Sequence, residues 1–329
     1  MKLAILGGGG VRMPAFVHAL LSSKECLFDD IALFEPDALR RATTARLAAG
    51  VAAALGHGDS VRVTAEVEEA FNGADFVFSA IRVGGDGGRI IDEEVALSRG
   101  IVGQETTGPG GAAMALRTIP VVLDYCRILA RVAPRAVLVN FTNPAGIVTE
   151  AITRHSGVRA VGVCDTPSGT IEQLAAFLHL DEAPWSYSYG GLNHLGWITS
   201  LCVDGEERLG ELLEHYELLQ RFDHRFAAHD ADLVRRVGAL PTEYVFYYYD
   251  PRRYLEGVRH AGSTRGKDVA RLNEELLVGL SRAFASGESA VDSFNEAWAL
   301  YCKVMGVRRD TYLRIDTDGE SGQQAARAR

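Results

Sequence analysis

Four consecutive glycines, Gly7 to Gly10, stand between a short apolar run and a helical pattern. Glycines in such a turn let a diphosphate group approach the backbone amides at the start of a helix. Glu35 follows the next apolar run, where a carboxylate can accept hydrogen bonds from an adenosine ribose and repels a 2′-phosphate. The pattern predicts an NAD+ site made by Gly7, Gly8, Gly9, Gly10 and Glu35. The alternative is a glycine-rich turn beside a solvated glutamate.

Two further glycine-rich segments carry polar side chains. Residues 103–111, GQETTGPGG, combine glycines with amide, hydroxyl and carboxylate groups, among them Glu105. This composition indicates backbone packed against a ligand such as a sugar, with a flexible loop as the alternative. Residues 82–89, RVGGDGGR, predict a second loop, in which Arg82 and Arg89 are either ligand-binding groups or solvated surface cations.

Asn143 lies in the segment NFTNPAG, residues 140–146, at the end of a predicted strand. Because Pro144 follows, we expect Asn143 to be extended and to end the strand. Its side-chain amide can then donate and accept hydrogen bonds at the cofactor edge of the sheet. A plain turn explains the Asn-Pro pair equally well.

Cys164 follows a predicted strand, and His194 lies in the segment GLNHLGW. A lone cysteine is usually a small buried apolar group. The chain has no C-x-x-C or H-x-x-x-H spacing, which argues against structural zinc. On the residues alone, Cys164 and His194 as metal ligands are a minority interpretation. The tyrosine-rich segment 241–249 mostly indicates core packing, although a tyrosine beside a metal and an arginine could have its pKa lowered enough to act as a base.

In the first half of the chain, short apolar runs alternate with amphipathic stretches, a pattern typical of βαβ units. The strands and helices that this pattern predicts would hold the residues described above in place. The pattern predicts strands at residues 2–6, 31–34, 61–64, 76–81, 136–140 and 160–164. It predicts helices at 14–21, 39–55, 66–71, 112–131 and 147–155. Right-handed crossovers place the carboxyl ends of all these strands at one edge. We therefore expect a Rossmann-like, doubly wound parallel α/β sheet that binds its ligand along that edge.

The pattern changes after about Thr166. A helix is expected at residues 170–178, and residues 185–204 alternate as antiparallel strands do. Further helices are expected at 267–284 and 291–305, whereas residues 316–329 lack an apolar face and are expected to be disordered. The sequence therefore predicts two domains. They are an NAD-binding Rossmann domain at 1–166 and an α+β substrate-binding and catalytic domain at 167–329.

Composition restricts partners and compartment. The 329 residues include 34 Lys and Arg against 43 Asp and Glu, a net charge of −9, so nucleic acid is not an expected partner. Five scattered cysteines do not form a disulfide framework, which fits a reducing cytoplasm. No stretch approaches the about 18 apolar residues of a membrane span, and the run before Gly7 is too short for a signal peptide. We expect a cytoplasmic protein without membrane partners.

Taken in order, the segments GGGGVRMP, IRVGG, GQETTGPGG, NFTNPAG, VGVCDTP, GLNHLGW and PTEYVFYYY resemble glycoside hydrolase family four, in particular its 6-phospho-β-glucosidases. The resemblance extends from Lys2 to about Arg265. This NAD-dependent family departs from the paired carboxylates of most glycosidases. The sequence likewise shows no obvious carboxylate pair.

The resemblance implies hydrolysis of 6-phospho-β-glucosides through redox and elimination steps. NAD+ oxidises carbon 3 of the sugar, a base removes the proton at carbon 2, and the aglycone leaves. Water then adds, and carbon 3 is reduced again. The resemblance assigns a divalent metal, Mn2+ or another, to Cys164 and His194, and it assigns the base to Tyr244.

The resemblance also implies a phosphorylated glucoside as the small-molecule partner. It assigns the phosphate to Arg89, Asn143 and Arg265, and it adds Glu105 and Asn193 as substrate-binding positions. Most relatives form dimers or tetramers, so we expect a homodimer or homotetramer. Relatives are generally longer at the C-terminus, so we expect either a shortened chain or an incomplete substrate pocket.

Two other functions stay open at this point. An NAD-dependent 2-hydroxyacid dehydrogenase of the lactate and malate type would share the sheet and the Asn-Pro turn. It would need a His and Asp pair to move protons, with arginines for a carboxylate and no metal. His194 lies in GLNHLGW, and nothing upstream of it offers the expected Asp-x-x-Arg partner. An inactive family member that only binds NAD is the second alternative.

Overall fold

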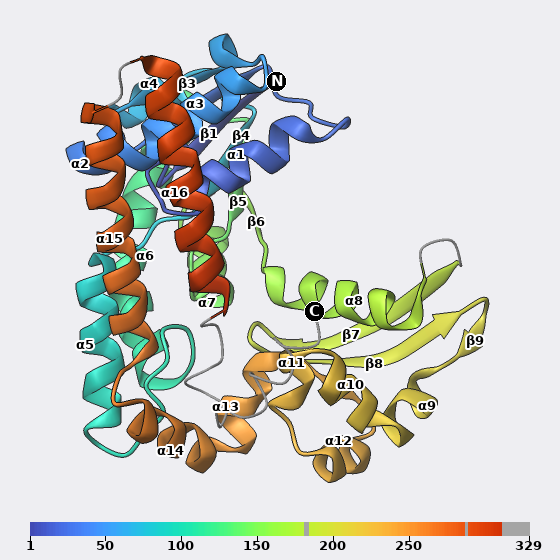
Figure 1. The fold of residues 1–329 in the computed structure, drawn as a ribbon. Coiled ribbons are helices and arrows are strands. Elements are labelled where there is room, and N and C mark those ends of the chain that lie inside the picture. The colour runs from blue at the N-terminus through green and yellow to red at the C-terminus, as the bar shows by residue number, and fades with distance from the viewer. Residues whose placement is uncertain (181–183, 287–288, 311–329) are drawn as a thin grey trace. The chain divides into compact units, whose positions relative to one another are not determined.

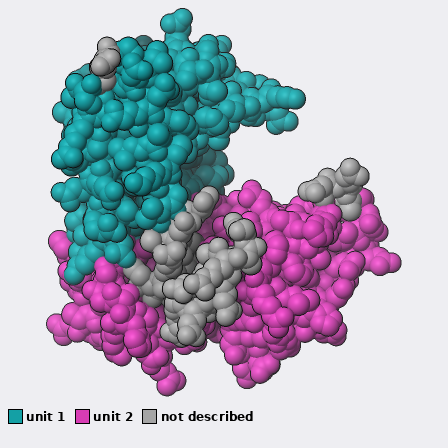
Figure 2. Space-filling view, in the orientation of Figure 1, with its two compact units in different colours: residues 1–90, 112–163, 266–310 teal, residues 91–111, 164–265, 311–329 magenta. Residues whose placement is uncertain are grey.

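The computed structural model of the chain describes residues 1–180, 184–286 and 289–310 (Figure 1). They form two compact units, shown in different colours in Figure 2. The described part of unit 2 is residues 91–111, 164–180 and 184–265. The described part of unit 1 is residues 1–90, 112–163, 266–286 and 289–310.

Each unit is therefore assembled from separate stretches of the chain. The predicted domains, 1–166 and 167–329, are continuous segments. The chain passes from unit 1 to unit 2 after Val163, close to the predicted boundary. The stretch 266–310, which the prediction included in the second domain, clusters with unit 1.

Unit 1 contains a parallel six-stranded sheet in the order β3-β2-β1-β4-β5-β6. Its strands are β1 Lys2–Leu6, β2 Asp30–Phe34, β3 Val61–Thr64, β4 Phe76–Ser79, β5 Val137–Asn140 and β6 Arg159–Gly162. All six predicted strands are present, with ends within two residues of those expected. Strand order reverses between β1 and β4, where sheets of this kind bind ligands. The predicted Rossmann-like α/β class is confirmed.

Helices pack on both faces of this sheet. They are α1 Met13–Ser22, α2 Ala38–Arg40, α3 Arg46–Ala54, α4 Val67–Phe71, α6 Gly108–Val132 and α7 Ala145–His155, with the short turns η1 Arg41–Ala45 and η2 Gly58–Ser60. In β1, Ala4 and Leu6 pack with residues of α4, α6 and α7, whereas Leu3 and Ile5 pack with residues of α1 and α3. Successive side chains of a strand point to opposite faces, so one continuous apolar run supplies both cores.

One helix was not predicted, and another begins earlier than the sequence pattern indicated. Helix α5 spans Gly85–Leu97, so Arg89 lies in a helix and the loop predicted at 82–89 is wrong from Gly85 onward. Helix α6 begins at Gly108 and not at Ala112. Glycine disfavours a helix by about 1 kcal/mol relative to alanine. In α6 the burial of Met114, Val122 and Leu129 further along the helix offsets this local cost. In α5 the buried side chains are Arg89, Asp92, Glu93 and Ala96.

Helices α15 Arg265–Ser286 and α16 Ala290–Asp310 contribute to a third core of unit 1 (Figure 1). Val11 and Leu47 pack there against apolar residues of both helices, namely Leu272, Leu276, Leu280, Ala297, Tyr301 and Val304. The Tyr301 hydroxyl also accepts a hydrogen bond from the Ala15 N–H over 3.2 Å. The last helices of the described chain thus complete the packing around its first residues.

Unit 2 is built around an antiparallel sheet in which β8 pairs with β7, β9 and β10. The strands are β7 Trp185–Leu192, β8 Leu195–Val203, β9 Glu206–Glu207 and β10 Leu240–Pro241. The antiparallel strands predicted at 185–204 are confirmed. Gly190 and Gly191 lie within β7, and the chain turns at Asn193 and His194.

The helices of unit 2 are α8 Asp165–Leu178, α9 Leu209–Glu214, α10 Tyr216–Phe222, α11 His224–Ala227, α12 Ala231–Val237, η3 Glu243–Val245, α13 Phe246–Tyr249 and α14 Pro251–Ala261. Ile171 of α8, Ile198 of β8 and Tyr216 of α10 share one buried core. No helix in the described residues has both the length and the apolar character needed to cross a bilayer. The tail predicted to be disordered, 316–329, lies outside the described residues.

Candidate active site

The four glycines form the turn between β1 and α1 in unit 1. The N–H groups of Gly7 and Gly8 donate to the Phe34 carbonyl over 3.2 and 2.9 Å. Gly7 has a φ of +85°, and a Cβ on Gly8 would lie 2.7 Å from the Cβ of Leu33. Glycine is therefore required here by the close approach of the turn to β2, whether or not a phosphate is bound.

The Glu35 carboxylate is directed into the same turn and is 7% exposed. Its Oε2 accepts from the Gly9 N–H and its Oε1 accepts from the Asp37 N–H, each over 3.1 Å. The alternative of a solvated glutamate is therefore wrong, because Glu35 is buried and its carboxylate accepts hydrogen bonds that stabilise the glycine turn. A carboxylate offers about four acceptor positions, so capacity is left for a ribose hydroxyl.

Asn143 lies between β5 and α7, and its side chain is half-buried. Asn140 fixes this turn, because its side-chain amide donates to the Thr142 carbonyl and to the Thr149 hydroxyl. The Thr142 hydroxyl accepts from the Ile81 N–H over 3.0 Å, which joins the turn to the end of β4. Asn143 therefore lies at the carboxyl edge of the sheet that carries the glycine turn, as expected.

Arg89 lies on α5 and is 6% exposed, so it is not a solvated surface cation. The turn before α5 is braced by Arg117, whose Nε donates to the Val83 carbonyl over 2.8 Å. Gly84 has a φ of +86°, and a Cβ there would lie 2.7 Å from the same Nε. This glycine therefore makes room for a side chain of the protein.

The segment 103–111 in unit 2 packs closely on itself. The Gln104 Oε1 accepts from the N–H groups of Thr106 and Thr107 over 2.6 and 2.8 Å. A Cβ on Gly110 would lie 2.3 Å from the Gln104 carbonyl oxygen, and one on Gly111 would lie 2.1 Å from that of Thr106. Close packing within the loop explains why glycine is needed at these positions. Any contact with a ligand would therefore come from the side chains of the segment and not from backbone exposed by the glycines.

Cys164 directly precedes α8, and its side chain is partly buried. The pKa of the Cys164 thiol is raised above its ordinary value, because burial and, to a smaller extent, the charge of Asp165 outweigh the hydrogen bonds from Thr166 and from the Asn193 side chain that lower it. The thiolate is the form that binds metals. The donors and the N-terminus of α8 favour the thiolate, and a bound cation would favour it further.

His194 lies in the turn between β7 and β8 with a φ of +59°, and it is 3% exposed. Its ring stacks on that of Tyr244, with centroids 3.8 Å apart and planes within 5°. Burial lowers the pKa of His194 to about 4, and the charges of Glu105 and Asp165 oppose this shift. The imidazole is therefore neutral at pH 7, which is the form that binds metals. Its buried Nδ1 has no hydrogen-bond partner among the described residues.

Five predicted residues thus belong to one cluster in unit 2. Tyr244 stacks on His194, Asn193 bonds Cys164, and the charge of Glu105 acts on His194. In the described part of the chain no three His, Cys, Asp or Glu side chains are grouped to hold a metal. A cation on Cys164 and His194 would therefore take its other ligands from water and substrate.

Three residues of this cluster were not predicted as site residues. The charge of Asp165 raises the pKa values of both Cys164 and His194. The pKa of Tyr189 is raised mainly by burial and to a smaller extent by the charges of Cys164 and Glu243. Asp165 and Glu243 directly neighbour predicted site residues in the sequence, which is a signal that could have been used. For Tyr189 the sequence showed only the alternating residue pattern that predicts strand β7, and nothing that indicates a site.

The predicted phosphate-binding residues are divided between the units. Arg265 begins α15, is half-buried and belongs to unit 2. Arg89 and Asn143 belong to unit 1, as do the four glycines and Glu35. Their joint role at one substrate stays a prediction.

Comparison with known proteins identifies the family. Residues 2–180 match the sequence profile of the Family 4 glycosyl hydrolase, and residues 189–309 match that of its C-terminal domain. The chain belongs to glycosyl hydrolase family 4. This family-4 chain is 37% identical over 227 residues to a 6-phospho-beta-glucosidase of Escherichia coli, covering 65% of the chain and 50% of that enzyme. It is 36% identical over 312 residues to 6-phospho-alpha-glucosidase 1 of Lacticaseibacillus paracasei, covering 89% and 70%.

Solved structures share the fold of this family-4 chain. A 6-phospho-beta glucosidase of Thermotoga maritima with manganese, NAD+ and glucose-6-phosphate has a TM-score of 0.74 and 26% identity, covering 92% of this chain and 72% of that one. A 6-phospho-alpha-glucosidase from gut microorganisms with NAD and glucose-6-phosphate has a TM-score of 0.76 and 26% identity, covering 94% and 73%. The predicted family is confirmed. The matched segments span 50% and 65% of the lengths of two curated relatives, from Escherichia coli and Bacillus subtilis.

Proposed function

We propose that this family-4 chain hydrolyses 6-phospho-β-glucosides, with NAD+ as a recycled cofactor and Mn2+ or another divalent cation. Membership of the family supports the proposal. The Escherichia coli relative bears the same activity in its name, and the Thermotoga maritima relative was solved with manganese, NAD+ and glucose-6-phosphate. A homodimer or homotetramer and a cytoplasmic location belong to the same proposal.

The observation that carries the proposal is the stack of Tyr244 on His194. It brings the residue assigned as the base against a residue assigned as a metal ligand, although they come from distant segments of the chain. Asn193, next to His194, bonds the thiol of the second assigned ligand, Cys164. A core-packing role for Tyr244 alone would not require its ring to lie flat on a buried histidine with an unpartnered Nδ1.

Cys164 and His194 fit a divalent cation. His194 offers its neutral ring, with a buried Nδ1 that has no hydrogen-bond partner among the described residues. Burial raises the pKa of Cys164, so its thiolate would depend on the cation itself, supported by the hydrogen bonds from Thr166 and Asn193. The carboxylates of Glu105 and Asp165 add negative charge near the imidazole. When bound, the cation polarises an oxygen of the sugar. Because Mn2+ prefers oxygen ligands, its affinity should rise when the substrate supplies them.

The glycine turn and Glu35 fit a dinucleotide. When bound, NAD+ would supply the hydride acceptor for oxidation of carbon 3 of the sugar, and the NADH so formed the hydride for its later reduction. The N–H groups of Gly7 to Gly10 already bond Phe34, Glu35 and the Gly7 carbonyl. The glycines would therefore let the diphosphate come close to the N-terminus of α1. The carboxylate of Glu35 would accept a hydrogen bond from a ribose hydroxyl.

The remaining side chains orient the sugar and move its proton. Tyr244, held flat on His194, removes the proton at carbon 2, and a neighbouring cation favours its phenolate. Glu105 and Asn193 bind sugar hydroxyls. Arg89, Asn143 and Arg265 bind the 6-phosphate, where an arginine can donate two parallel hydrogen bonds.

A chromogenic assay tests the proposal. The purified chain, with NAD+ and Mn2+, should release nitrophenol from nitrophenyl 6-phospho-β-glucoside without net accumulation of NADH. Tyr244→Phe should lower kcat at least about a hundredfold, the loss expected when a positioned base is removed. Cys164→Ser should lower both the affinity for Mn2+ and kcat, because it removes a metal ligand. Cys202→Ser, at a partly buried cysteine on β8, is the matched control and should keep full activity.

The outcomes distinguish the alternatives. Turnover of the α-anomer alone would replace the β assignment, and equal turnover of the unphosphorylated glucoside would refute the phosphate site. Net NADH production would indicate a dehydrogenase. NAD+ binding without release of nitrophenol from any of these substrates would indicate an inactive family member.

A further inference from the structure

The stack of Tyr244 on His194 lies just beyond the end of a short antiparallel ladder. The two residues of β10 pair with two residues of β8, and Pro241 lies opposite Trp197. In an antiparallel pair, each step forward on one strand matches a step backward on the other. Three steps beyond the pair of Pro241 and Trp197, this register brings Tyr244 opposite His194. The ladder between β10 and β8 therefore determines which side chain faces the histidine.

Thr242 is the first residue after β10, and it bonds the chain to β8. Its N–H and its hydroxyl both donate to the Gly196 carbonyl, each over 3.1 Å. A carbonyl oxygen has two lone pairs and can accept both bonds. The Thr242 carbonyl in turn accepts from the Val245 N–H over 3.1 Å, which closes the η3 turn around Tyr244. Thr242 thus joins the turn that carries Tyr244 to the strand that follows His194.

The ladder that Thr242 extends has few bonds of its own. Strand β10 consists of two residues at one edge of the sheet, where β8 is its neighbour. One of the two, Pro241, has no N–H to donate. Thr242 is fully buried, and a buried hydroxyl is unfavourable unless it is hydrogen-bonded. Valine has the same shape without the polar atom, so the bond to Gly196 is what threonine provides at this position.

The acceptor, Gly196, is enclosed by its neighbours. A Cβ at this position would lie 1.7 Å from the Oη of Tyr189, so the Tyr189 hydroxyl occupies the space of any larger residue. Tyr189 lies on β7 opposite Ile198 of β8, which is fully buried in the core of unit 2. Glycine is therefore required at residue 196, and its carbonyl is held in place by the sheet.

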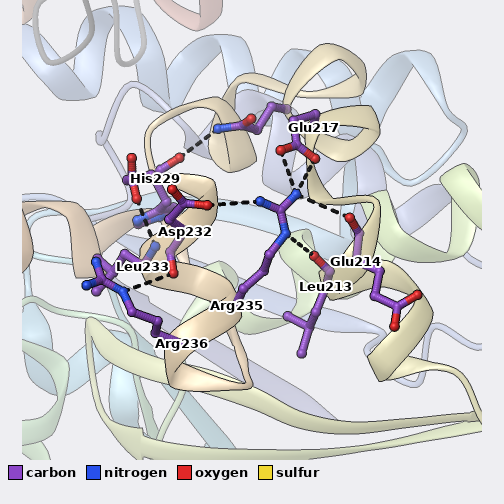
Figure 3. Close-up of polar contacts among 10 residues, drawn as sticks. Leu213, Glu214, Glu217, His229, Asp232, Leu233, Arg235 and Arg236 are labelled. Carbon is purple, nitrogen blue, oxygen red and sulfur yellow. Dashed lines mark hydrogen bonds and ion pairs between the residues drawn. The ribbon is translucent and has the colours of Figure 1, made fainter.

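Helices support the core on which β8 lies (Figure 3). Ile198 shares this core with apolar residues of α9, α10 and α12. Arg235 of α12 donates to the Leu213 carbonyl of α9 over 3.1 Å and pairs with Glu217 of α10 over 2.5 Å. Because these helices are tied together, we expect loss of the bond at Thr242 to displace the η3 turn and not β8.

We propose that Thr242 is a positioning residue: by donating its hydroxyl to the Gly196 carbonyl, it holds the η3 turn so that Tyr244 stays stacked on His194. The kinetic consequence rests on the proposed function, in which Tyr244 removes the proton at carbon 2. The structural consequence, dependence of the stack on the Thr242 hydroxyl, does not rest on it. Both consequences can be measured on the same variants.

Three variants separate positioning from general destabilisation. Thr242→Val removes the hydroxyl but keeps the shape of the side chain and the backbone N–H. Thr242→Ser keeps the hydroxyl and removes only the methyl group. Val234→Ala is the control, because Val234 of α12 is fully buried in the core that contains Ile198, and its truncation destabilises that core without removing the bond. Thermal unfolding of all three variants shows how much stability each has lost.

In the kinetic test, Thr242→Val should lower kcat roughly tenfold, less than the about hundredfold loss that a displacement of about 1 Å can cause, because the backbone N–H still bonds the Gly196 carbonyl. The KM should change little. The deuterium isotope effect at carbon 2 of the substrate should increase, because proton removal becomes slower. Thr242→Ser and Val234→Ala should keep kcat and the isotope effect near the wild-type values. Wild-type kcat in Thr242→Val, or an equal loss in Thr242→Ser, would overturn the proposal.

A test without turnover uses the carbon-bound ring protons of His194, whose NMR shifts report the Tyr244 ring stacked on them. The resonances are assigned with a His194→Ala variant. They should move in Thr242→Val and stay in place in Thr242→Ser and Val234→Ala. Unchanged His194 resonances in Thr242→Val would overturn the proposal even in an active enzyme. An inactive wild-type chain would refute the proposed function, while these shifts would still decide the role of Thr242.

Discussion

Replacing Glu35 by Gln should loosen the glycine turn and weaken NAD+ binding by separately measurable amounts. The change keeps the size of the side chain but turns one acceptor oxygen into an NH2 group. In the structure both oxygens are in use, by the N–H groups of Gly9 and Asp37, each at 3.1 Å in a buried position. One of these N–H groups would therefore face a donor. A buried N–H without a partner costs about 1–3 kcal/mol, or about 2–12 °C in Tm for a domain of 150–250 residues.

The assay combines thermal unfolding without cofactor with calorimetric titration of NAD+. If Glu35 also bonds the ribose, loss of a bond to a charged group, about 1.5–3 kcal/mol, should raise the Kd roughly 10- to 100-fold. Glu68→Gln is the matched control, because Glu68 pairs with Arg131 at an exposed position and should change stability by less than about 1 kcal/mol. An unchanged Tm without cofactor would refute the bracing of the turn. A lowered Tm with an unchanged Kd would refute the ribose contact.

Three further predictions concern packing and pH. Gly8→Ala should lower the free energy of unfolding by about 1–3 kcal/mol. Gly10→Ala should lower it by less, because its Cβ would lie 3.1 Å from the nearest atom, against 2.7 Å at Gly8. Equal losses of unfolding free energy in chemical denaturation would contradict this prediction. His229 has a pKa of about 3 when folded and about 6.5 when unfolded, so its contribution to stability is complete above pH 6.5 and should fall by about 2 kcal/mol at pH 5. His229→Asn should remove this part of the pH dependence, and an identical pH profile would refute the assignment. Hydrogen bonds from Ser200 and the backbone lower the pKa of Glu207 to about 2, so its contribution to stability is present above about pH 4.5 and lost towards pH 2. In Glu207→Gln the free energy of unfolding should therefore depend less on pH between about 4.5 and 2.

Much of the sheet in unit 1 could be predicted because each strand is a continuous apolar run between turn residues. A strand buried on both faces has this pattern, and β1 supplies two cores with alternate side chains. Helix α5 and the start of α6 could not be predicted in the same way. Gly85 and Gly108 indicate loops by their local preference, and only the packing of later residues in each helix decides otherwise.

The assembly of unit 1 from separate stretches was also beyond sequence patterns. The apolar stripe of α15 predicts that one side of the helix is buried, but not that Val11 and Leu47 are its partners. Periodicity describes a single element, whereas the choice of partner depends on contacts between residues far apart in the chain.

The site shows the same division between local and distant information. Gly7 to Gly10 and Glu35 were found from spacing, because a turn and its neighbouring strand are close in sequence. The roles of Cys164, His194 and Tyr244 came from resemblance to a family, since nothing local connects them.

The third core of unit 1 has a consequence for the order of folding during synthesis. Val11 and Leu47 leave the ribosome long before their apolar partners on α15 and α16, which are among the last described residues to be made. Until those helices emerge, this part of the nascent chain has an uncovered apolar surface. A fragment ending at residue 166 would keep that surface exposed permanently, and we expect it to aggregate or to require a chaperone.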